Sequence, residues 1–353
     1  MSGPGATRVS PGLLEVADLR VRLNTSRGPG DALRGIGFSL DRGETVGLIG
    51  ESGCGKSMTA LALMGLLPEG ARTTGSIRFD GQELVGLDDD ALGRLRGRRI
   101  AMIFQEPMTA LNPLHTVGAQ VAEPLRRHLG MNRRQARAEA LRLLERVRLP
   151  QPRERLDAYP HQLSGGQRQR VMIAAALACG PDLLIADEPT TALDVTIQAE
   201  ILDLIGELVA TAGMALLLIS HDLDVMANHV QRVMVMYGGT IAESGPTERV
   251  FERLAHPYTR GLFGARPRLG TPRGTRLPTI PGRVPELVDL PRGCPFADRC
   301  PRLIGACSEP PPAFVVQAGH EARCFNMEPG SPGATRDSGV DDGSPGCTRA
   351  TNT

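Results

Sequence analysis

The sequence predicts an α/β protein built on a parallel sheet, and two observations support this. An apolar strand ending at Gly50 runs into a glycine-rich loop and then a helix, which is typical of a parallel sheet. Two later segments, PDLLIADEP and MALLLISHD, each contain an apolar run that ends in polar residues. Buried parallel strands carry functional groups at their carboxyl ends in this way, so we expect the site at that edge.

Length and composition narrow the class of protein. The chain has 353 residues, which suits one large domain with an appendage or two domains. The formal net charge is +1, so no strongly basic face for nucleic acid is predicted. No run of about 18 apolar residues occurs, and the start lacks the apolar stretch of a signal peptide. We therefore expect a cytoplasmic protein whose seven cysteines are reduced or metal-bound.

In the N-terminal half, the sequence predicts strands, one helix that follows the glycine-rich loop, and then a helical region. Residues 1–11, rich in Gly, Pro and Ser, predict a flexible lead-in. LLEVADLRVRL predicts a strand, and IGFSLDRGETVGLIG predicts two strands around a turn at 41–43. The helix SMTALALMGLL is expected to end at Pro68. From about residue 88 to 165 the chain is more charged and more helical, and RRQARAEALRLLERVRL predicts a helix with a solvated arginine face.

The C-terminal half predicts a return to strands and then a change of composition. VQRVMVMYGGTIAESG predicts a hairpin with a Gly-Gly turn. After about residue 252 the chain is rich in Pro, Gly and Arg, and four of the seven cysteines follow. These features suggest a separate C-terminal module at 256–328. The last residues, 329–353, are low in apolar content and predict a disordered tail.

The glycine-rich loop GESGCGKS fits the P-loop pattern G-x-x-x-x-G-K-[ST]. Its glycines let successive N–H groups face a phosphate, and the following helix presents its N-terminus to the same anion. Lys56, the only lysine of the chain, places a compact charge on the outer phosphates, and Ser57 is a candidate Mg²⁺ ligand. The alternative, a chance glycine-rich turn, is disfavoured by the preceding strand, the following helix and the solitary lysine.

Two further motifs complete a nucleotide-hydrolysis pattern. LLIADE ends in Asp187, a candidate water-mediated Mg²⁺ ligand, and Glu188, a candidate general base. A pair of surface acids at a strand end is the alternative, but a P-loop requires such a partner. LSGGQRQR places Ser164, Gly165 and Gly166 at a helix start, which predicts a second anion site. Two such sites are consistent with one chain binding its own ATP and the ATP of a neighbouring subunit.

At this point the sequence resembles the ATP-binding cassette family, because the P-loop, LSGGQ, LLIADEP, TALD and ISHD follow in its order. The resemblance implies a P-loop NTPase cassette at 12–255, with a RecA-like core, an antiparallel β subdomain, a helical subdomain at about 88–165 and a small Cys/Pro-rich C-terminal module. It implies the dimer-seam role for Asp194 and the γ-phosphate switch role for His221. Gln105 is implied to sense Mg²⁺ and water and to couple to a membrane subunit.

The resemblance sets the expected site. The expected catalytic residues are Glu188, His221 and Gln105, and the expected Mg²⁺ residues are Ser57, Gln105 and Asp187. The expected ATP-binding residues are Gly50, Glu51, Ser52, Gly53, Cys54, Gly55, Lys56, Ser57, Met58, Gln105, Ser164, Gly165, Gly166, Gln167, Asp187 and Asp194. One departure concerns the adenine base, because the family stacks an aromatic ring on it from the first strand and this chain offers only Leu23 there.

Longer segments resemble one subfamily, the ATPases of oligopeptide, dipeptide and nickel importers. They include IAMIFQEPMTALNP, which is more similar to the D-type subunit, and HPYTRGL followed by IPGRVPEL. The implied activity is ATP hydrolysis driving import of di- or oligopeptides, with nickel or another solute, or a cassette ATPase without a transport role, as alternatives. The implied partners are a second ATPase, two membrane permeases and an extracytoplasmic solute-binding protein, with no nucleic acid. The chain would lie peripherally on the cytoplasmic face of the membrane.

The cysteine cluster has the spacing Cys294-x5-Cys300-x6-Cys307-x16-Cys324. The tight C-x2-C pair typical of zinc fingers is missing, and two of these cysteines precede proline, as iron–sulfur ligands sometimes do. The subfamily is associated with a four-iron cluster at this module. A 4Fe-4S cluster, a structural Zn²⁺ ion and free thiols stay open as alternatives.

Overall fold

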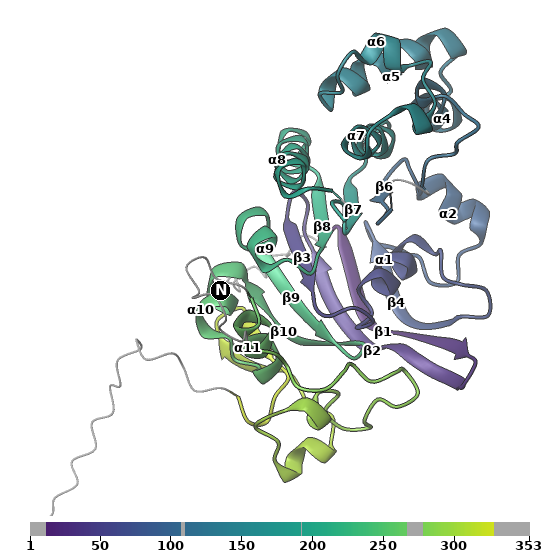
Figure 1. Ribbon diagram of the computed structural model, residues 1–353. Coiled ribbons are helices and arrows are strands. Elements are labelled where there is room, and N and C mark those ends of the chain that lie inside the picture. Colours follow the sequence, from purple (N-terminus) through teal and green to yellow (C-terminus); the bar gives the residue numbers. More distant parts are fainter. Residues whose placement is uncertain (1–11, 107–109, 192, 267–277, 328–353) are drawn as a thin grey trace, which may run out of the picture.

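The computed structural model describes residues 12–106, 110–191, 193–266 and 278–327 (Figure 1). Within these residues the strands form two sheets, of order β11-β12-β10-β9-β3-β8-β7-β6 and β2-β1-β4-β5. The strands are β1 (Leu14–Thr25), β2 (Gly28–Leu40), β3 (Thr45–Ile49), β4 (Arg72–Phe79), β5 (Gln82–Glu83), β6 (Ile100–Ile103), β7 (Leu183–Asp187), β8 (Ala215–Ile219), β9 (Arg232–Tyr237), β10 (Thr240–Pro246), β11 (Phe314–Gln317) and β12 (His320–Ala322).

The larger sheet has a parallel centre, as the sequence predicts. Strands β9, β3, β8, β7 and β6 pair in parallel, and β10, β12 and β11 continue the sheet in antiparallel pairs. The smaller sheet is antiparallel throughout. Both sheets therefore confirm the predicted cassette fold, with a parallel core and an antiparallel β subdomain.

The helices cover the larger sheet and form one end of the molecule (Figure 1). They are α1 (Lys56–Met64), α2 (Asp89–Leu95), α4 (Val117–Leu129), α5 (Arg133–Arg146), α6 (Pro152–Arg155), α7 (Gly165–Ala176), α8 (Val195–Ala212), α9 (Leu223–His229), α10 (Thr247–Arg253) and α11 (Pro257–Gly264). The described residues also form the 3₁₀ helices η1 (Pro160–Gln162), η2 (Ala297–Arg299) and η3 (Gly305–Ser308). Figure 1 shows α4, α5 and α6 together, far from the C-terminal segment, by which we mean the described residues 256–266 and 278–327.

The centre of the larger sheet is apolar on both faces. In β8, Leu217 and Ile219 point into a core shared with α1 and the smaller sheet, whereas Leu216 and Leu218 point into a core shared with α7, α8 and α9. A continuous apolar strand sequence is required when both faces are covered. This burial fixes the carboxyl ends of β3, β7 and β8, the strand ends that carry the predicted motifs.

Two local predictions differ from the structure. Helix α1 ends at Met64 rather than at Pro68, because Gly65 adopts a left-handed conformation with φ of 61° and caps the helix. The described part of the predicted helical range 88–165 includes the strand β6, which pairs with β7 at the edge of the larger sheet. This strand has only four residues, all apolar, so its hydrophobic pattern cannot distinguish a strand from a helix.

The described C-terminal segment is an extension of the cassette, so a separate Cys/Pro-rich module is not confirmed. Strand β12 pairs with β10 and carries β11 beside it, which lengthens the larger sheet. Cys294, Phe296 and Cys307 belong to the same apolar core as Tyr237 and Tyr258. The predicted flexible lead-in and disordered tail lie outside the described residues. Among those that are described, no helix has the length and apolarity needed to cross a membrane.

Candidate functional site

The P-loop connects β3 to α1 at the carboxyl end of the parallel strands. Gly50, with φ of 155°, and Gly55, with φ of 108°, both lie in conformations that side chains rarely adopt. A Cβ at Gly50 would collide with the carbonyl oxygen of Met236, and one at Gly55 would lie 3.0 Å from the carbonyl oxygen of Ala32. The glycines are therefore required both by the turn and by the close approach of β2 and β9.

The start of α1 leaves its backbone amides without a side-chain cap. Gly55 occupies the N-cap position, and the first N–H groups of a helix have no partner within it. Ser57 and Met58 follow in the first turn, and the Met58 side chain packs against the core, which leaves its backbone N–H as the group available to a phosphate. Uncapped amides at a helix N-terminus form an anion site.

Lys56 is buried, with 5% of its surface exposed. Its Nζ donates to the carbonyl oxygens of Gly50, at 2.8 Å, and Glu51, at 3.1 Å, and lies 4.0 Å from Cys54 Sγ. The ammonium is therefore held against the loop that it follows. The residues of the expected phosphate cradle, from Gly50 to Ser57, form the loop between β3 and α1 and the start of α1.

The surroundings of Asp187 show whether the residues present suit a Mg²⁺ ion. Its side chain is 3% exposed, and its Oδ1 is buried without a hydrogen-bond partner. Burial raises the pKa of Asp187, and the charge of Glu188 adds to this, whereas a hydrogen bond with Ser57 and the charge of Lys56 lower it. An unpartnered carboxylate oxygen beside a serine hydroxyl is a suitable donor set for Mg²⁺, so the residues fit this ion.

Glu188 is the centre of a cluster that brings three expected residues together. Gln105 Nε2 donates to Glu188 Oε2 at 3.0 Å, and His221 Nδ1 lies 3.5 Å from Glu188 Oε1. Thr191, which the sequence analysis did not single out, also donates to Glu188 Oε2, at 3.1 Å. The cluster joins three segments that follow β6, β7 and β8, and His221 is 68% exposed, so a reacting group has access.

The backbone at Glu188 is strained in a way that aims its side chain. Its φ is 45°, in the left-handed region that costs a non-glycine residue about 1–3 kcal/mol when held there. The Glu188 N–H donates to the carbonyl oxygen of Ile219 at the end of β8, which fixes the turn. A carboxylate held by Gln105, Thr191 and His221 at an open strand end can accept a proton from water.

The second expected anion site lies apart from the P-loop. Ser164 Oγ accepts the N–H of Gln167 at 3.3 Å, while Gln167 Oε1 accepts the N–H of Ser164 at 3.1 Å, so α7 begins with its own capping box. Asp194 caps α8 in a similar way by accepting the N–H of Ile197. A cavity of about 480 Å³ contains Ser164, Gly165, Gly166, Gln167 and Asp194 but no P-loop residue. The chain does not bring these residues to its own P-loop.

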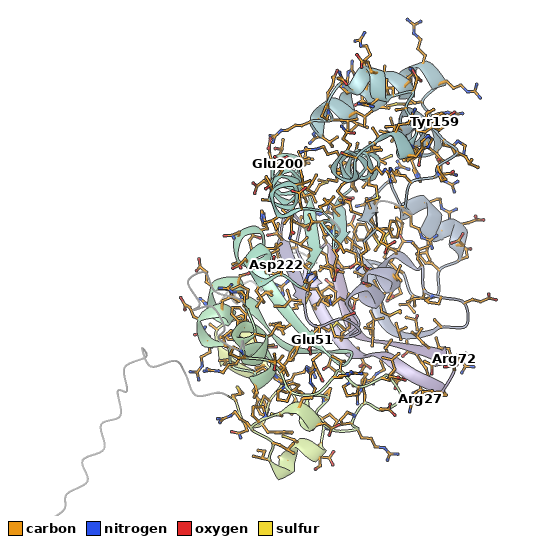
Figure 2. The ribbon with its side chains drawn as sticks, in the orientation of Figure 1. Arg27, Glu51, Arg72, Tyr159, Glu200 and Asp222 are labelled. Carbon is orange, nitrogen blue, oxygen red and sulfur yellow. The ribbon has the colours of Figure 1, made fainter. Side chains whose placement is uncertain are left out.

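The C-terminal segment contacts the P-loop directly, which the sequence analysis missed. Arg299 is 5% exposed and forms a two-nitrogen ion pair with Glu51, at 2.6 and 3.1 Å. Tyr258 Oη accepts the Glu51 N–H at 2.8 Å. Figure 2 places Glu51 between the larger sheet and this segment. Arg299 is separated from Glu51 by 248 residues, so no local motif could have revealed the pair.

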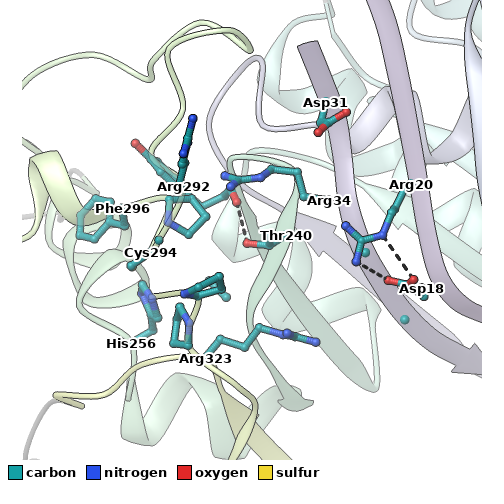
Figure 3. Close-up of a pocket in the computed structure, with 18 residues that line it drawn as sticks. Asp18, Arg20, Asp31, Arg34, Thr240, His256, Arg292, Cys294, Phe296 and Arg323 are labelled. Atoms are coloured by element: carbon teal, nitrogen blue, oxygen red, sulfur yellow. Dashed lines mark hydrogen bonds and ion pairs between the residues drawn. The ribbon is translucent and has the colours of Figure 1, made fainter. Parts of the chain in front are cut away.

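A second cavity, of about 570 Å³, lies between the smaller sheet and the C-terminal segment (Figure 3). Arg20 pairs with Asp18 at 2.8 Å on one side, and Arg34 donates to the carbonyl oxygen of Pro291 on the other. Among the described residues that line it, none belongs to the P-loop and none is Glu188 or His221. This cavity is therefore not the phosphate site.

The four clustered cysteines lie near one another, and the structure pairs none of the four in a disulfide. Burial raises the pKa of Cys294, and burial raises that of Cys324 to about 11, with the other thiolates of the cluster adding to both shifts. Within the part of the chain that the structure describes, no three His, Cys, Asp or Glu side chains are arranged to hold a metal ion. The described geometry therefore does not fit the expected cluster or zinc ion.

Comparisons with known proteins show which families the chain is similar to. Residues 33–191 match the family described as ABC transporter, and residues 242–307 match the one described as oligopeptide/dipeptide transporter, C-terminal region. The chain is 49% identical over 313 residues to the oligopeptide transport ATP-binding protein OppD of Salmonella typhimurium, covering 89% of this chain and 93% of OppD. It is 48% identical over 322 residues to Escherichia coli OppD, covering 91% and 95%.

A solved structure supports the fold independently. The dimeric post-hydrolysis state of the ATP-binding cassette MJ0796, bound to ADP and Pi, matches with a TM-score of 0.60 and 29% identity. The match covers 66% of this chain and 98% of that chain.

Proposed function

The chain belongs to the ATP-binding subunits of ABC transporters, and from this premise we propose that it is the motor of an importer for di- or oligopeptides. The observation that carries the proposal is the likeness to OppD proteins along nearly their whole length, including the C-terminal region. ATP hydrolysis is the activity of the family, and the cluster around Glu188 supplies the groups that this reaction requires.

We infer the following roles for the site residues. The P-loop amides and Lys56 bind the β- and γ-phosphates, and Ser57 and Asp187 hold Mg²⁺, directly or through water. Magnesium neutralises charge on the transferred phosphoryl group when it is bound. Glu188 accepts a proton from the attacking water, while Gln105 and His221 orient the carboxylate and the γ-phosphate.

The second ATP-binding surface requires a partner. Because Ser164 and Asp194 share a cavity that excludes the chain's own P-loop, they are proposed to meet the ATP of a second, similar ATPase subunit. The further proposed partners are two membrane permeases and an extracytoplasmic solute-binding protein. Gln105 lies in the segment proposed to move with the permeases, and the chain would lie peripherally on the cytoplasmic face of the membrane.

The proposed boundaries remain those of the sequence analysis, with the cassette at 12–255 and the C-terminal region from residue 256. A 4Fe-4S cluster or Zn²⁺ at the four cysteines is kept as a prediction, although the described thiols are not arranged to hold a metal ion. Iron, acid-labile sulfide and zinc in the purified protein test it. Four thiols that all react with a thiol reagent, with no metal present, would contradict it.

The test of function is peptide uptake with Glu188→Gln. We expect this variant to bind ATP normally, to hydrolyse it about 10²–10⁴-fold more slowly and to abolish uptake of labelled di- and oligopeptides. The control is Glu248→Gln, an exposed glutamate on α10, which should behave as wild type. Normal hydrolysis in Glu188→Gln would overturn the assignment. Slow hydrolysis with unchanged peptide uptake would keep the motor and point to another cargo, with nickel tested first.

A further inference from the structure

A cavity of about 330 Å³ lies beside the P-loop, at the point where the C-terminal segment passes the turn between β1 and β2. It is lined by Thr25, Ser26, Arg27, Ser52, Gly53, Val284, Pro285, Glu286, Leu287 and Val288. Ser52 and Gly53 belong to the phosphate cradle. A molecule whose phosphates lie on the P-loop can therefore extend into this cavity.

The two sides of this cavity differ in chemistry. The side formed by β1 and its turn is polar, and the apolar residue nearest the end of β1 is Leu23. The side formed by the C-terminal segment carries Val284, Leu287 and Val288, which are half-buried and apolar. A nucleotide base has flat apolar faces and a polar edge, so an apolar wall opposite polar groups matches its surface.

The C-terminal wall is held in place from three points. Arg27 Nη1 lies 2.8 Å from Glu286 and 2.6 Å from Asp289, which joins the β1–β2 turn to the wall. Leu287 packs on Gly30, where an added Cβ would lie 2.7 Å from Leu287 Cβ, so a larger residue would displace the wall. Arg34 fixes the following residues by donating to Pro291. An ordered wall costs little conformational entropy when a ligand binds.

We propose that residues 284–288 form one wall of the binding site for the base of ATP, in place of an aromatic ring from β1. The inference rests on the proposed ATPase function and adds the source of the base contacts. The C-terminal segment then contributes to the nucleotide site twice, through the base wall and through the Arg299–Glu51 pair on the P-loop. This arrangement is compatible with the lack of an aromatic residue near Leu23.

The experiment compares ATP with inorganic triphosphate, which has the phosphates but no base. Dissociation constants of both are measured with Mg²⁺ for wild type, Leu287→Ala and Leu287→Met. We expect Leu287→Ala to weaken ATP binding about 5-fold, because apolar contact with the base is lost, and to leave triphosphate binding unchanged. Leu287→Met keeps the volume and should bind both ligands as wild type does.

A matched control is Leu303→Ala, which truncates an exposed leucine of the same segment outside this cavity and should change neither affinity. Unchanged ATP affinity in Leu287→Ala would overturn the base wall. An equal loss for ATP and triphosphate would also overturn it, since the residue would then act only through the P-loop. Failure of the wild-type protein to bind either ligand would instead overturn the proposed function.

Discussion

The two helix starts proposed to bind phosphate are built in opposite ways. Helix α1 begins at Gly55 with no side-chain cap, and its loop is supported from behind by Arg299 and Tyr258. Helix α7 begins at Ser164, whose hydroxyl is already used within its own capping box. The α1 site has no side-chain cap and is supported by Arg299 and Tyr258. The α7 site has its own capping box, and Ser164 is exposed.

This difference indicates which site can act alone. The α1 site has no side-chain cap that a phosphate would have to displace, although Lys56 Nζ already donates to the carbonyl oxygens of Gly50 and Glu51. The α7 site can keep its capping hydrogen bonds, because Ser164 Oγ accepts within the capping box and its O–H can donate to a ligand that another subunit brings. We therefore expect ATP affinity of the separate subunit to depend on α1 and its supports, and hydrolysis by the assembled pair to depend also on α7.

The largest expected effect comes from placing a negative charge at the start of α7. Asp is as good an N-cap as Ser, so Ser164→Asp keeps the start of α7, but its carboxylate repels a triphosphate. We expect hydrolysis by the assembled transporter to fall about 100-fold or more, while ATP affinity of the separate subunit and its melting temperature stay unchanged. Ser164→Asn, a neutral cap, is the control. Lost ATP affinity in the separate subunit would show that the two sites are not independent.

The second effect tests the support behind the P-loop. Arg299→Ala removes the partner of Glu51, and we expect the free energy of unfolding to fall by about 2 kcal/mol, less than for a fully buried pair because Glu51 is 29% exposed. Denaturant unfolding measures this, and ATP titration should show weaker binding. Arg283→Ala, at an exposed arginine of the same segment, is the control. Wild-type stability and ATP affinity in Arg299→Ala would show that the Arg299–Glu51 pair does not support the P-loop.

The third effect tests the geometry at α1 itself. Lys56→Arg keeps the charge, but a planar guanidinium cannot occupy the place where Nζ contacts the carbonyl oxygens of Gly50 and Glu51. We expect ATP to bind about 10-fold more weakly, which a nucleotide titration measures. An arginine variant with wild-type affinity and hydrolysis rate would show that charge alone is sufficient at this position.

The sequence predicts the first of these two sites far better than its supports. The P-loop and the strand ends at Asp187 and Ile219 follow from local patterns, and so does the position of Ser164 in the second site. The Arg299–Glu51 pair and the wall at Leu287 join segments more than 200 residues apart, and no period or motif encodes such a contact. Strand β6 was missed because its pairing with β7, rather than its own four residues, makes it a strand.

The smallest expected effect concerns His256, at the start of the helix that carries Tyr258. His256 caps α11, which carries Tyr258, by accepting the Tyr258 N–H at its Nδ1. Burial lowers the pKa of His256 to about 4, whereas Glu243 opposes this shift. The unfolded chain therefore binds the proton first as pH falls below about 6.5, and stability decreases from there until pH 4. The expected loss from pH 7 to pH 5.5 is about 1 kcal/mol.

Replacing His256 by Asn isolates this contribution. Asn keeps an acceptor at the cap but does not titrate, so the variant should lose the pH-dependent part of the unfolding free energy. Glu243 faces His256 and bonds to the buried His320, and both groups remain in the variant, so the difference between the two pH profiles belongs to His256. Parallel profiles between pH 7 and pH 5.5 would mean that the titration of His256 does not contribute to the pH dependence of stability.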